Sequence, residues 1–428
     1  MPRRKQPQMN GAPAAKIPRV PLTLPIPERP KRSAKLLVCG QGDMGQLGLG
    51  EDKMESRFPT AVASLSDIVD CCAGGMHSLC LTQTGDIYSF GCNDEGALGR
   101  DTSEDGSEFE PRKMDLPGQA VKICAGDSHS ACLLEDGRVF ACGSFRNSHG
   151  NMGLTLEGNK WRPVNILPGV EAHDISSGAD HLVILACNGN VFTIGCAEQG
   201  QLGRVPLRDA GGDSRRGKDE LLNPQTIHVK HKKQFDSIWT TIYCTFVRKN
   251  KEGDVYAFGL NNYNQLCMPK TDMPVPVPKK TSLKDVLAIA GGQHHTLVLT
   301  SDNKCHSIGR RDYGRLGLGE LSEDVAELTA VKALQEREVV QISCGEAQSF
   351  AVTKDGEVYA WGMGSNQSLG TGKEDDEMVP VLLNSKEVKG KKVLKVTSGG
   401  QHSLFLVDGE ELKPVCTYIS STKKQSMR

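Results

Sequence analysis

The sequence lacks the long apolar runs and the catalytic motifs that define many protein classes. No apolar run reaches the roughly 18 residues of a membrane span, and the basic, Pro-rich amino terminus has no apolar segment typical of a secretory signal. The chain contains no G-x-S-x-G elbow, no G-x-x-x-x-G-K-[ST] phosphate loop and no H-E-x-x-H motif. We therefore expect a soluble intracellular protein with no covalent chemistry, no bound nucleotide and no membrane partner.

Aromatic residues are scarce, and cysteines with the C-x-x-C spacing of metal or redox sites are absent. Aromatics make up 5% of the chain, whereas glycine occurs 47 times, which favours many short strands and turns over long helices. The 15 cysteines form no C-x-x-C pair and no Cys/His block with zinc spacing. Strand-like runs contain Cys80, Cys132, Cys142, Cys196 and Cys305. Cysteine is therefore interpreted as a small core hydrophobe in a reducing compartment, and we expect no metal and no cofactor.

The net charge of −1 conceals an uneven distribution. Residues 1–35 contain nine Lys or Arg and one acid, which leaves 42 basic and 51 acidic residues for the remainder of the chain. A basic arm is thus joined to an acidic body. This pattern indicates a tail that meets an anionic partner while the body has a separate role.

A repeat of about 50 residues runs through the chain. A glycine follows a strand-like run at Gly40, Gly91, Gly143, Gly195, Gly259, Gly309 and Gly362. Each unit reads approximately G-x-x-H, an apolar run, a turn, a second apolar run and G-x-L-G. The stretch "HSLCLTQTGDIYSFG" is predicted to form two strands joined by a turn at Thr84–Gly85. Seven units with this period are typical of propeller blades.

The two ends of the chain complete one repeat. The first copy, "LVCGQGDMGQLGLG", has only the second half of a unit, and the last, "SGGQHSLFLVDG" (398–409), has only the first half. The sequence therefore predicts an all-β, seven-bladed β-propeller over residues 36–411, in which amino- and carboxy-terminal strands share one blade and remove the open edge. A flexible basic amino-terminal tail (1–35) and a basic carboxy-terminal tail (412–428) complete the domain prediction.

Several segments resemble the regulator of chromosome condensation family, the chromatin-bound exchange factors for the small GTPase Ran. The resemblance spans roughly residues 36–410, and its segments include "GQGDMGQLGLG", "GGMHSLCL", "YSFGCNDEGALGRDTSEDGSE", "GSFRNSHG", "GCAEQGQLGRVP" and "DGEVYAWGMGSNQSLGTG". It implies a nuclear, chromatin-associated protein that releases GDP from Ran. The product, Ran-GTP, would serve nuclear transport and the assembly of the spindle and nuclear envelope.

One repeat has a longer tip than the others. Between Gly143 and the closing "GNMG" this copy has two more residues than its neighbours. The residues alone favour a tolerated loop insertion, which is common at blade turns. The resemblance implies instead a wedge that contacts the GTPase, formed by Phe145, Arg146, Asn147, Ser148, His149 and Gly150. Asn147 stands where the family has an acid, so its role stays open.

The residues before each repeated histidine interrupt the repeat with charged groups. Two acids there, Asp127 and Asp180, would face one surface and suit a basic partner. By resemblance, Asp127, Asp180 and His294 contact the GTPase, with Asp43 and His402 as neighbours. The repeated His77 and His129 are interpreted as structural, since polar groups at strand starts commonly satisfy neighbouring backbone.

Basic segments outside the blades suggest a second partner. The candidates for DNA contact or for binding a nuclear import carrier are Arg3, Arg4, Lys5, Lys31 and Arg32, and the alternative is a plain solvated tail. An insertion at 204–220 resembles the family's histone-binding loop, and arginine suits clustered carboxylates of a nucleosome. Its candidates are Arg208, Arg215 and Arg216, with no choice made among them. We expect a monomer.

Three other functions remain as alternatives. A propeller scaffold that binds chromatin without exchanging nucleotide would have the same repeats. A light-sensing propeller requires a tryptophan cluster, and the chain has only Trp161, Trp239 and Trp361. A propeller hydrolase is supported by no group of residues in the sequence.

Overall fold

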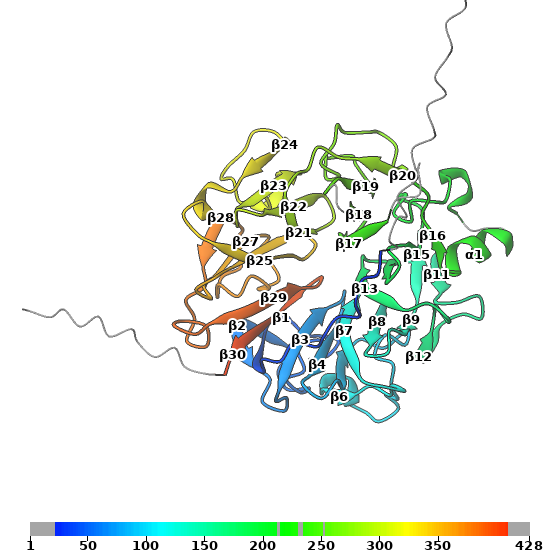
Figure 1. The fold of residues 1–428 in the computed structure, drawn as a ribbon. Helices are drawn as coiled ribbons and strands as arrows, with labels where there is room; N and C mark the ends of the chain where they lie inside the picture. Colours follow the sequence, from blue (N-terminus) through cyan, green and yellow to red (C-terminus); the bar gives the residue numbers. More distant parts are fainter. Residues whose placement is uncertain (1–21, 212–214, 230–233, 251–252, 410–428) are drawn as a thin grey trace, which may run out of the picture.

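Seven antiparallel sheets surround a central axis in the computed structural model, which describes residues 22–211, 215–229, 234–250 and 253–409 (Figure 1). Each blade has four strands, with the first nearest the axis and the fourth at the rim in Figure 1. Blade 1 consists of β3 (Ile68–Ala73), β4 (His77–Thr82), β5 (Ile87–Gly91) and β6 (Arg112–Lys113). Blade 2 consists of β7 (Ala120–Ala125), β8 (His129–Leu134), β9 (Val139–Gly143) and β12 (Lys160–Asn165). Blade 3 consists of β13 (Ala172–Ser177), β14 (His181–Ala186), β15 (Val191–Gly195) and β16 (Gln225–Thr226).

The remaining blades follow the same plan. Blade 4 consists of β17 (Phe235–Thr240), β18 (Cys244–Lys249), β19 (Val255–Gly259) and β20 (Val275–Lys280). Blade 5 consists of β21 (Val286–Gly291), β22 (His295–Thr300), β23 (Cys305–Gly309) and β24 (Val325–Ala330). Blade 6 consists of β25 (Val339–Cys344), β26 (Gln348–Thr353), β27 (Val358–Gly362) and β28 (Glu377–Leu382). A short hairpin, β10 (Phe145–Asn147) with β11 (Gly150–Gly153), and one helix, α1 (Arg215–Leu222), are added to this frame.

Blade 7 joins the two ends of the chain, as the half repeats predicted. It consists of β29 (Val393–Ser398), β30 (His402–Asp408), β1 (Ala34–Gln41) and β2 (Glu55–Ala61). Strand β1 pairs with β30 continuously from Ala34↔Asp408 to Gly40↔His402. The predicted seven-bladed propeller, closed by strands from both ends of the chain, is confirmed.

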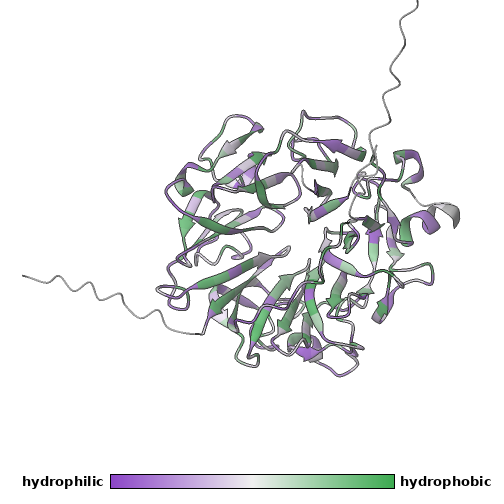
Figure 2. Cartoon of the chain, viewed as in Figure 1, coloured by the Kyte–Doolittle hydropathy of each residue, from purple (hydrophilic) through white to green (hydrophobic). Residues whose placement is uncertain are grey.

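Apolar side chains between neighbouring blades form the core. The leucine of each G-x-L-G loop lies between blades, and Leu98, Leu202 and Leu369 are fully buried. Cysteine behaves as the sequence indicates, since Cys39, Cys80 and Cys305 are completely buried. Figure 2 shows apolar residues along the strands and hydrophilic residues in many of the loops. Burial between blades explains why no single repeat could be stable alone.

The repeated histidines link each blade to the next. The Nε2 of His77 lies 2.8 Å from Ser130 Oγ in blade 2, and Ser130 Oγ in turn donates to the carbonyl of Ala97. Because that hydroxyl proton is already used, His77 Nε2–H is the donor to Ser130. Burial lowers the pKa of His77 to about 4, so the ring stays neutral. The structure thus gives His77 the structural role expected from the sequence.

The glycine before each histidine provides the space for its ring. A Cβ on Gly126 would lie 2.1 Å from the His129 ring and 2.4 Å from the carbonyl oxygen of Ala179 in the next blade. We predict that Gly126→Ala lowers the free energy of unfolding by about 1–3 kcal/mol, because the overlap forces backbone to move. Chemical denaturation measures this. Gly409→Ala is the control, since a Cβ there meets nothing within 4 Å. Equal stability of the two variants would contradict the explanation.

The described part of the predicted amino-terminal tail contacts the propeller. Residues 22–33 do not extend away from the propeller but lie along it, and we call them the amino-terminal strap. In Figure 1 the strap is the dark blue segment that passes β13 and β7 before it enters β1. Its Leu24 N–H donates to the carbonyl of Cys187, and Arg29 Nε donates to the carbonyl of Ala120. The boundary at residue 35 was therefore wrong, because apolar residues and Arg29 fix this segment to the blades.

Candidate functional site: the channel mouth and its hairpin

The connections between strands lie on two opposite faces of the propeller. One face holds the connections from the first to the second strand of each blade, together with the loops after β5, β9 and β15, and we call it the hairpin face. The other holds the tight turns between second and third strands, such as Thr84–Gly85, and we call it the turn face. All candidate GTPase contacts lie in connections of the hairpin face or at the strand ends beside them.

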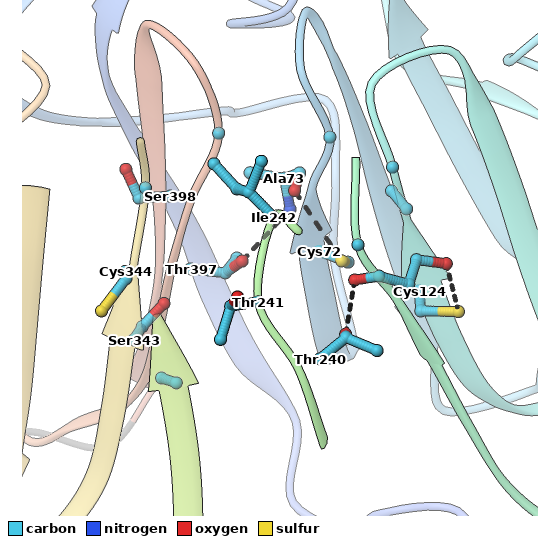
Figure 3. A pocket seen from close by; sticks show the side chains of 18 of the residues that line it. Cys72, Ala73, Cys124, Thr240, Thr241, Ile242, Ser343, Cys344, Thr397 and Ser398 are labelled. Carbon is cyan, nitrogen blue, oxygen red and sulfur yellow. Dashed lines mark hydrogen bonds between the residues drawn. The ribbon is translucent and has the colours of Figure 1, made fainter. Parts of the chain in front are cut away.

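Backbone hydrogen bonds join neighbouring blades around part of the axis at the hairpin face. The N–H of Gly400 donates to the carbonyl of Gly75, and that of Gly75 donates to the carbonyl of Gly126. The N–H of Asp127 then donates to the carbonyl of Ala179 at 2.8 Å. Below this mouth is a channel cavity of about 290 Å³, and Figure 3 shows Cys72, Cys124, Thr240, Cys344 and Thr397 among its lining residues.

Acidic side chains from three blades gather at this mouth. Asp127, Asp180 and Glu346 follow the innermost strands of blades 2, 3 and 6. Surrounding protein displaces water from Asp180, and the Asp127 carboxylate lies nearby, so the pKa of Asp180 rises to about 7. Desolvation also raises the pKa of Asp127, although its side chain still reaches solvent. The pKa of Glu346 is also raised, first by desolvation and then by the nearby charge of Asp127. The mouth therefore concentrates negative charge that lacks full hydration.

The longer tip forms the two-stranded β10–β11 hairpin beside these acids. Its backbone is fixed to the propeller by Asp180, whose Oδ1 accepts the N–H of Arg146 at 2.7 Å. From blade 3, Glu198 accepts both the N–H of Ser148 at 2.9 Å and its hydroxyl at 2.6 Å. From blade 1, Glu95 lies 3.8 Å from Arg146 Nη1. Carboxylates from both neighbouring blades therefore hold the hairpin in one orientation.

Phe145 belongs to the base of the hairpin rather than to its tip. Its side chain is fully buried, and its ring lies 4.7 Å from that of His129. Arg146, Ser148 and His149 are exposed, so these residues form the surface of the tip. Asn147 Oδ1 accepts the N–H of His149 at 2.9 Å, a local bond that an aspartate could make equally well. The departure from the family's acid is therefore compatible with the same turn.

A basic and aromatic group lies at the same face in blades 4 and 5. The His294 ring lies 5.1 Å from the Tyr263 ring. The guanidinium of Arg310 lies over the same Tyr263 ring, 5.3 Å from its centre. Desolvation, followed by Arg315 and Arg310, lowers the pKa of His294 to about 4, so it is neutral at physiological pH. His294 is therefore a hydrogen-bonding and packing group here rather than a charge.

The structure does not support His402 as a neighbour of the GTPase contacts. His402 occupies the buried position of His77, with no exposed surface, and its Nε2 lies 2.8 Å from Ser78 Oγ. The residue equivalent to Asp180 and His294 is Gln401. The imidazole of His402 cannot reach a partner at the surface, whereas Asp43, in the loop after β1, is exposed.

The basic candidates lie apart from the channel mouth. Arg208 is in a short 3-10 helix, Leu207–Asp209, and its side chain is 84% exposed. Arg215 and Arg216 begin helix α1, which lies at the rim of blade 3 in Figure 1. In the strap, Lys31 is exposed, whereas Arg32 forms an ion pair with the buried Asp408. Arg3, Arg4 and Lys5 lie outside the described residues.

Sequence reasoning missed Glu95, Glu198 and Tyr263. A signal was present for the two glutamates, because the loops on either side of the longer tip, "GCNDEG" and "GCAEQG", each contain an acid close to the second glycine. Tyr263 had no such signal, since its loop, "GLNNYNQL", lacks the second glycine that marks the other two loops. Among the described residues no group of three or more His, Cys, Asp or Glu could hold a metal ion. No helix in the described part of the chain is long and apolar enough to cross a membrane.

These features define a protein-binding propeller with a rigid hairpin beside an acidic channel mouth. The RCC1-like domain model matches residues 35–405, and the chain belongs to this family. It is 53% identical to the Drosophila melanogaster regulator of chromosome condensation, over 96% of this chain and 77% of that protein. It is 28% identical to the Saccharomyces cerevisiae guanine nucleotide exchange factor SRM1, over 85% of each chain.

Two solved structures have the same fold. One is described as the crystal structure of Prp20p from S. cerevisiae and its binding properties to Gsp1p and histones; it has a TM-score of 0.81 and 27% identity, and the match covers 92% of this chain and 94% of that one. The other is Kap60 bound to yeast RCC1 (Prp20), with a TM-score of 0.82 and 25% identity over 95% of this chain and 97% of that one. The three tryptophans lie in different blades, in or beside β12, β17 and β27, so they form no light-sensing cluster.

Proposed function

We propose that this protein is the guanine nucleotide exchange factor that releases GDP from Ran on chromatin. The observation that supports this most strongly is the β10–β11 hairpin, fixed through Asp180 beside an acidic mouth. The relative named as an exchange factor supports the activity, and the Prp20p structure, with its stated binding to Gsp1p and histones, supports the partners. The same relatives disfavour a scaffold that does not exchange nucleotide.

The proposed mechanism is differential binding without covalent chemistry. An exchange factor must bind the nucleotide-free GTPase more tightly than the loaded form, and the difference drives release. Asp127, Asp180 and Glu346 would meet basic groups of the GTPase that contact phosphate in its loaded state. The exposed tip, with Arg146, Ser148 and His149, would enter the space next to the nucleotide. Because Glu95 and Glu198 already fix the tip, little ordering free energy is lost on binding.

Attachment to chromatin would use the basic segments. The exposed Arg208, with Arg215 and Arg216, suits the acidic patch of histones, and Arg3, Arg4 and Lys5 suit DNA phosphate. An import carrier is a further proposed partner of the basic arm, since a relative's structure includes Kap60. A nuclear, chromatin-bound location follows from these proposals, and we expect the protein to act as a monomer.

The proposal is tested by mixing the protein with Ran stripped of nucleotide by a chelator and separating the mixture by gel filtration. We expect a one-to-one complex that persists in nucleotide-free buffer and dissociates when either GDP or GTP is added with Mg²⁺. A complex that survives added nucleotide would identify a scaffold instead, and no complex at all would reject the proposal.

The activity should depend on pH through Asp180. Its pKa of about 7 lies above the usual aspartate value, so the folded chain holds this proton between about pH 4 and 7 while the unfolded chain does not. Ionisation of Asp180 as the pH rises therefore destabilises the free folded protein. A basic partner stabilises the ionised carboxylate and so favours binding at higher pH. We predict that stimulated GDP release rises between pH 6 and 8 with a midpoint near 7. The pH dependence should disappear in Asp180→Asn, once intrinsic release from Ran is subtracted at each pH.

A further inference from the structure

The turn face is covered by the amino-terminal strap on one side of the axis. The strap contacts blade 3 where the carbonyl of Pro25 lies 2.5 Å from His173 Nδ1, and blades 2 and 1 where Arg29 donates to the carbonyls of Ala120 and Gln83. It ends at blade 7, where Arg32 pairs with Asp408. The described strap residues thus cross blades 3, 2, 1 and 7, and at the start of the strap Leu24 also packs against apolar residues between blades 3 and 4. None of these contacts involves blades 5 and 6.

The innermost strand of every blade has a bulge near the turn face, and the bulge residues provide equivalent positions at which the cover can be compared. In each blade one extra residue interrupts the pairing of the first two strands close to the turn face, for example between Ile68 and Asp70 and between Val286 and Ala288. The seven extra residues are Val69, Val121, His173, Asp236, Leu287, Val340 and Leu394.

The exposure of these equivalent residues differs between the blades, with His173 and Leu394 intermediate. Val69 and Val121, in blades that the strap crosses, are 6% and 7% exposed. Leu287 and Val340, in the neighbouring blades 5 and 6, are each 48% exposed. In blade 4 the position is the charged Asp236, which pairs with Arg248 at 2.8 Å. Two adjacent apolar side chains therefore lie open at the positions where their equivalents are covered.

We propose that the carboxy-terminal segment, residues 410–428, covers Leu287 and Val340 as a second strap on the turn face. Strand β30 ends at Asp408 on this face, in blade 7, directly beside blade 6. The amino-terminal strap needs only the residues from Pro25 to Arg32 to pass from blade 3 to blade 7, which is three steps between blades. The 19 residues after Gly409 are ample for the two steps to blade 5.

The composition of the segment suits this role. It contains the apolar residues Leu412, Val415, Tyr418 and Ile419 around Pro414, within an otherwise polar sequence. The amino-terminal strap has the same character, with Leu22, Leu24 and Ile26 between prolines, and its Leu22 and Ile26 lie against turn glycines. Extended, Pro-containing segments lose less conformational entropy on docking than flexible ones. The domain boundary at residue 411 would then exclude a segment that belongs to the propeller.

Thiol labelling tests the proposal. Val340→Cys is introduced into the full chain and into a chain that ends at Gly409, which retains all of β30, and the rate of iodoacetamide labelling at position 340 is followed by peptide mass spectrometry. We expect labelling about tenfold slower in the full chain, as for a docked state that holds about nine-tenths of the molecules. Val379→Cys is the matched control, because Val379 is 44% exposed on β28 at the rim and should react equally in both chains.

Three results would overturn the proposal. Equal labelling of position 340 in the two chains would show that residues 410–428 do not cover it. Protection that weakens on dilution would assign the surface to a second copy of the chain. Protection that appears only when nucleosomes are added would assign it to chromatin. Adding Val415→Ser and Ile419→Ser to the full chain should restore fast labelling without affecting the fold, which circular dichroism verifies.

Discussion

Deletion of Ser148 and His149 is expected to reduce stimulated GDP release from Ran by about 100-fold, with the fold intact. The deletion gives this loop the length of its neighbours and brings Asn147 next to Gly150, a pair that favours a tight two-residue hairpin turn. The β10–β11 pairing of Arg146 with Asn151 can then remain. The bond from Glu198 to Ser148 and the exposed tip are lost. Loss of about 3 kcal/mol is typical for a central contact of an interface and corresponds to about 100-fold.

The stopped-flow release of fluorescent GDP measures this effect. A matched control is Glu157→Ala in the loop that follows β11, because its side chain is exposed and pairs only locally with Lys160. The control should exchange at the rate of the unmodified protein. If the shortened hairpin also exchanged at that rate, the longer tip would be a tolerated insertion, the interpretation that the residues alone favoured.

Asp180→Ala is expected to have a comparable effect, also about 100-fold, by two routes that can be separated. The substitution removes a carboxylate from the acidic mouth and also removes the acceptor of the Arg146 N–H. Asp180→Asn removes the charge but retains an oxygen that can accept this hydrogen bond. Alanine should therefore impair release more than asparagine does, and the difference measures the contribution of fixing the hairpin.

Exposed acids elsewhere provide the control for Asp180. Glu336→Ala, beside the innermost strand of blade 6 near the turn face, removes one negative charge far from the channel mouth. Its exchange rate should be unchanged, because the proposed GTPase contacts lie on the opposite face. A uniform loss of activity in Glu336→Ala and Asp180→Ala would point to net charge rather than to a specific contact.

The repeat made the fold predictable from sequence. Period, glycine positions and the two half repeats each encode local geometry, so blade number and closure could be inferred without a structure. The strap could not, because "LTLPIPER" lacks a repeat equivalent and its proline content is also typical of a disordered tail. Only the turn face, assembled from distant blades, provides the carbonyls that Arg29 contacts.

The site was predictable in part. Asp127 and Asp180 were recognisable because they interrupt a repeat, and the structure brings them to one mouth. The burial of Phe145 was not recognisable, since it depends on which side of a strand faces a neighbouring blade. The burial of His402 was recognisable, because "GGQHSLFL" aligns residue for residue with "GGMHSLCL". Glu95 and Glu198 act on the hairpin from two other repeats, so their signal becomes visible only when the loops of neighbouring repeats are compared.

The most direct test of the exchange function is the release of fluorescent GDP from purified Ran, with excess GTP and a catalytic amount of this protein. We predict an acceleration of several orders of magnitude, with each molecule of the protein discharging many molecules of Ran. Release at the intrinsic rate in the presence of a folded protein would contradict the account and leave a propeller that binds partners without exchanging their nucleotide.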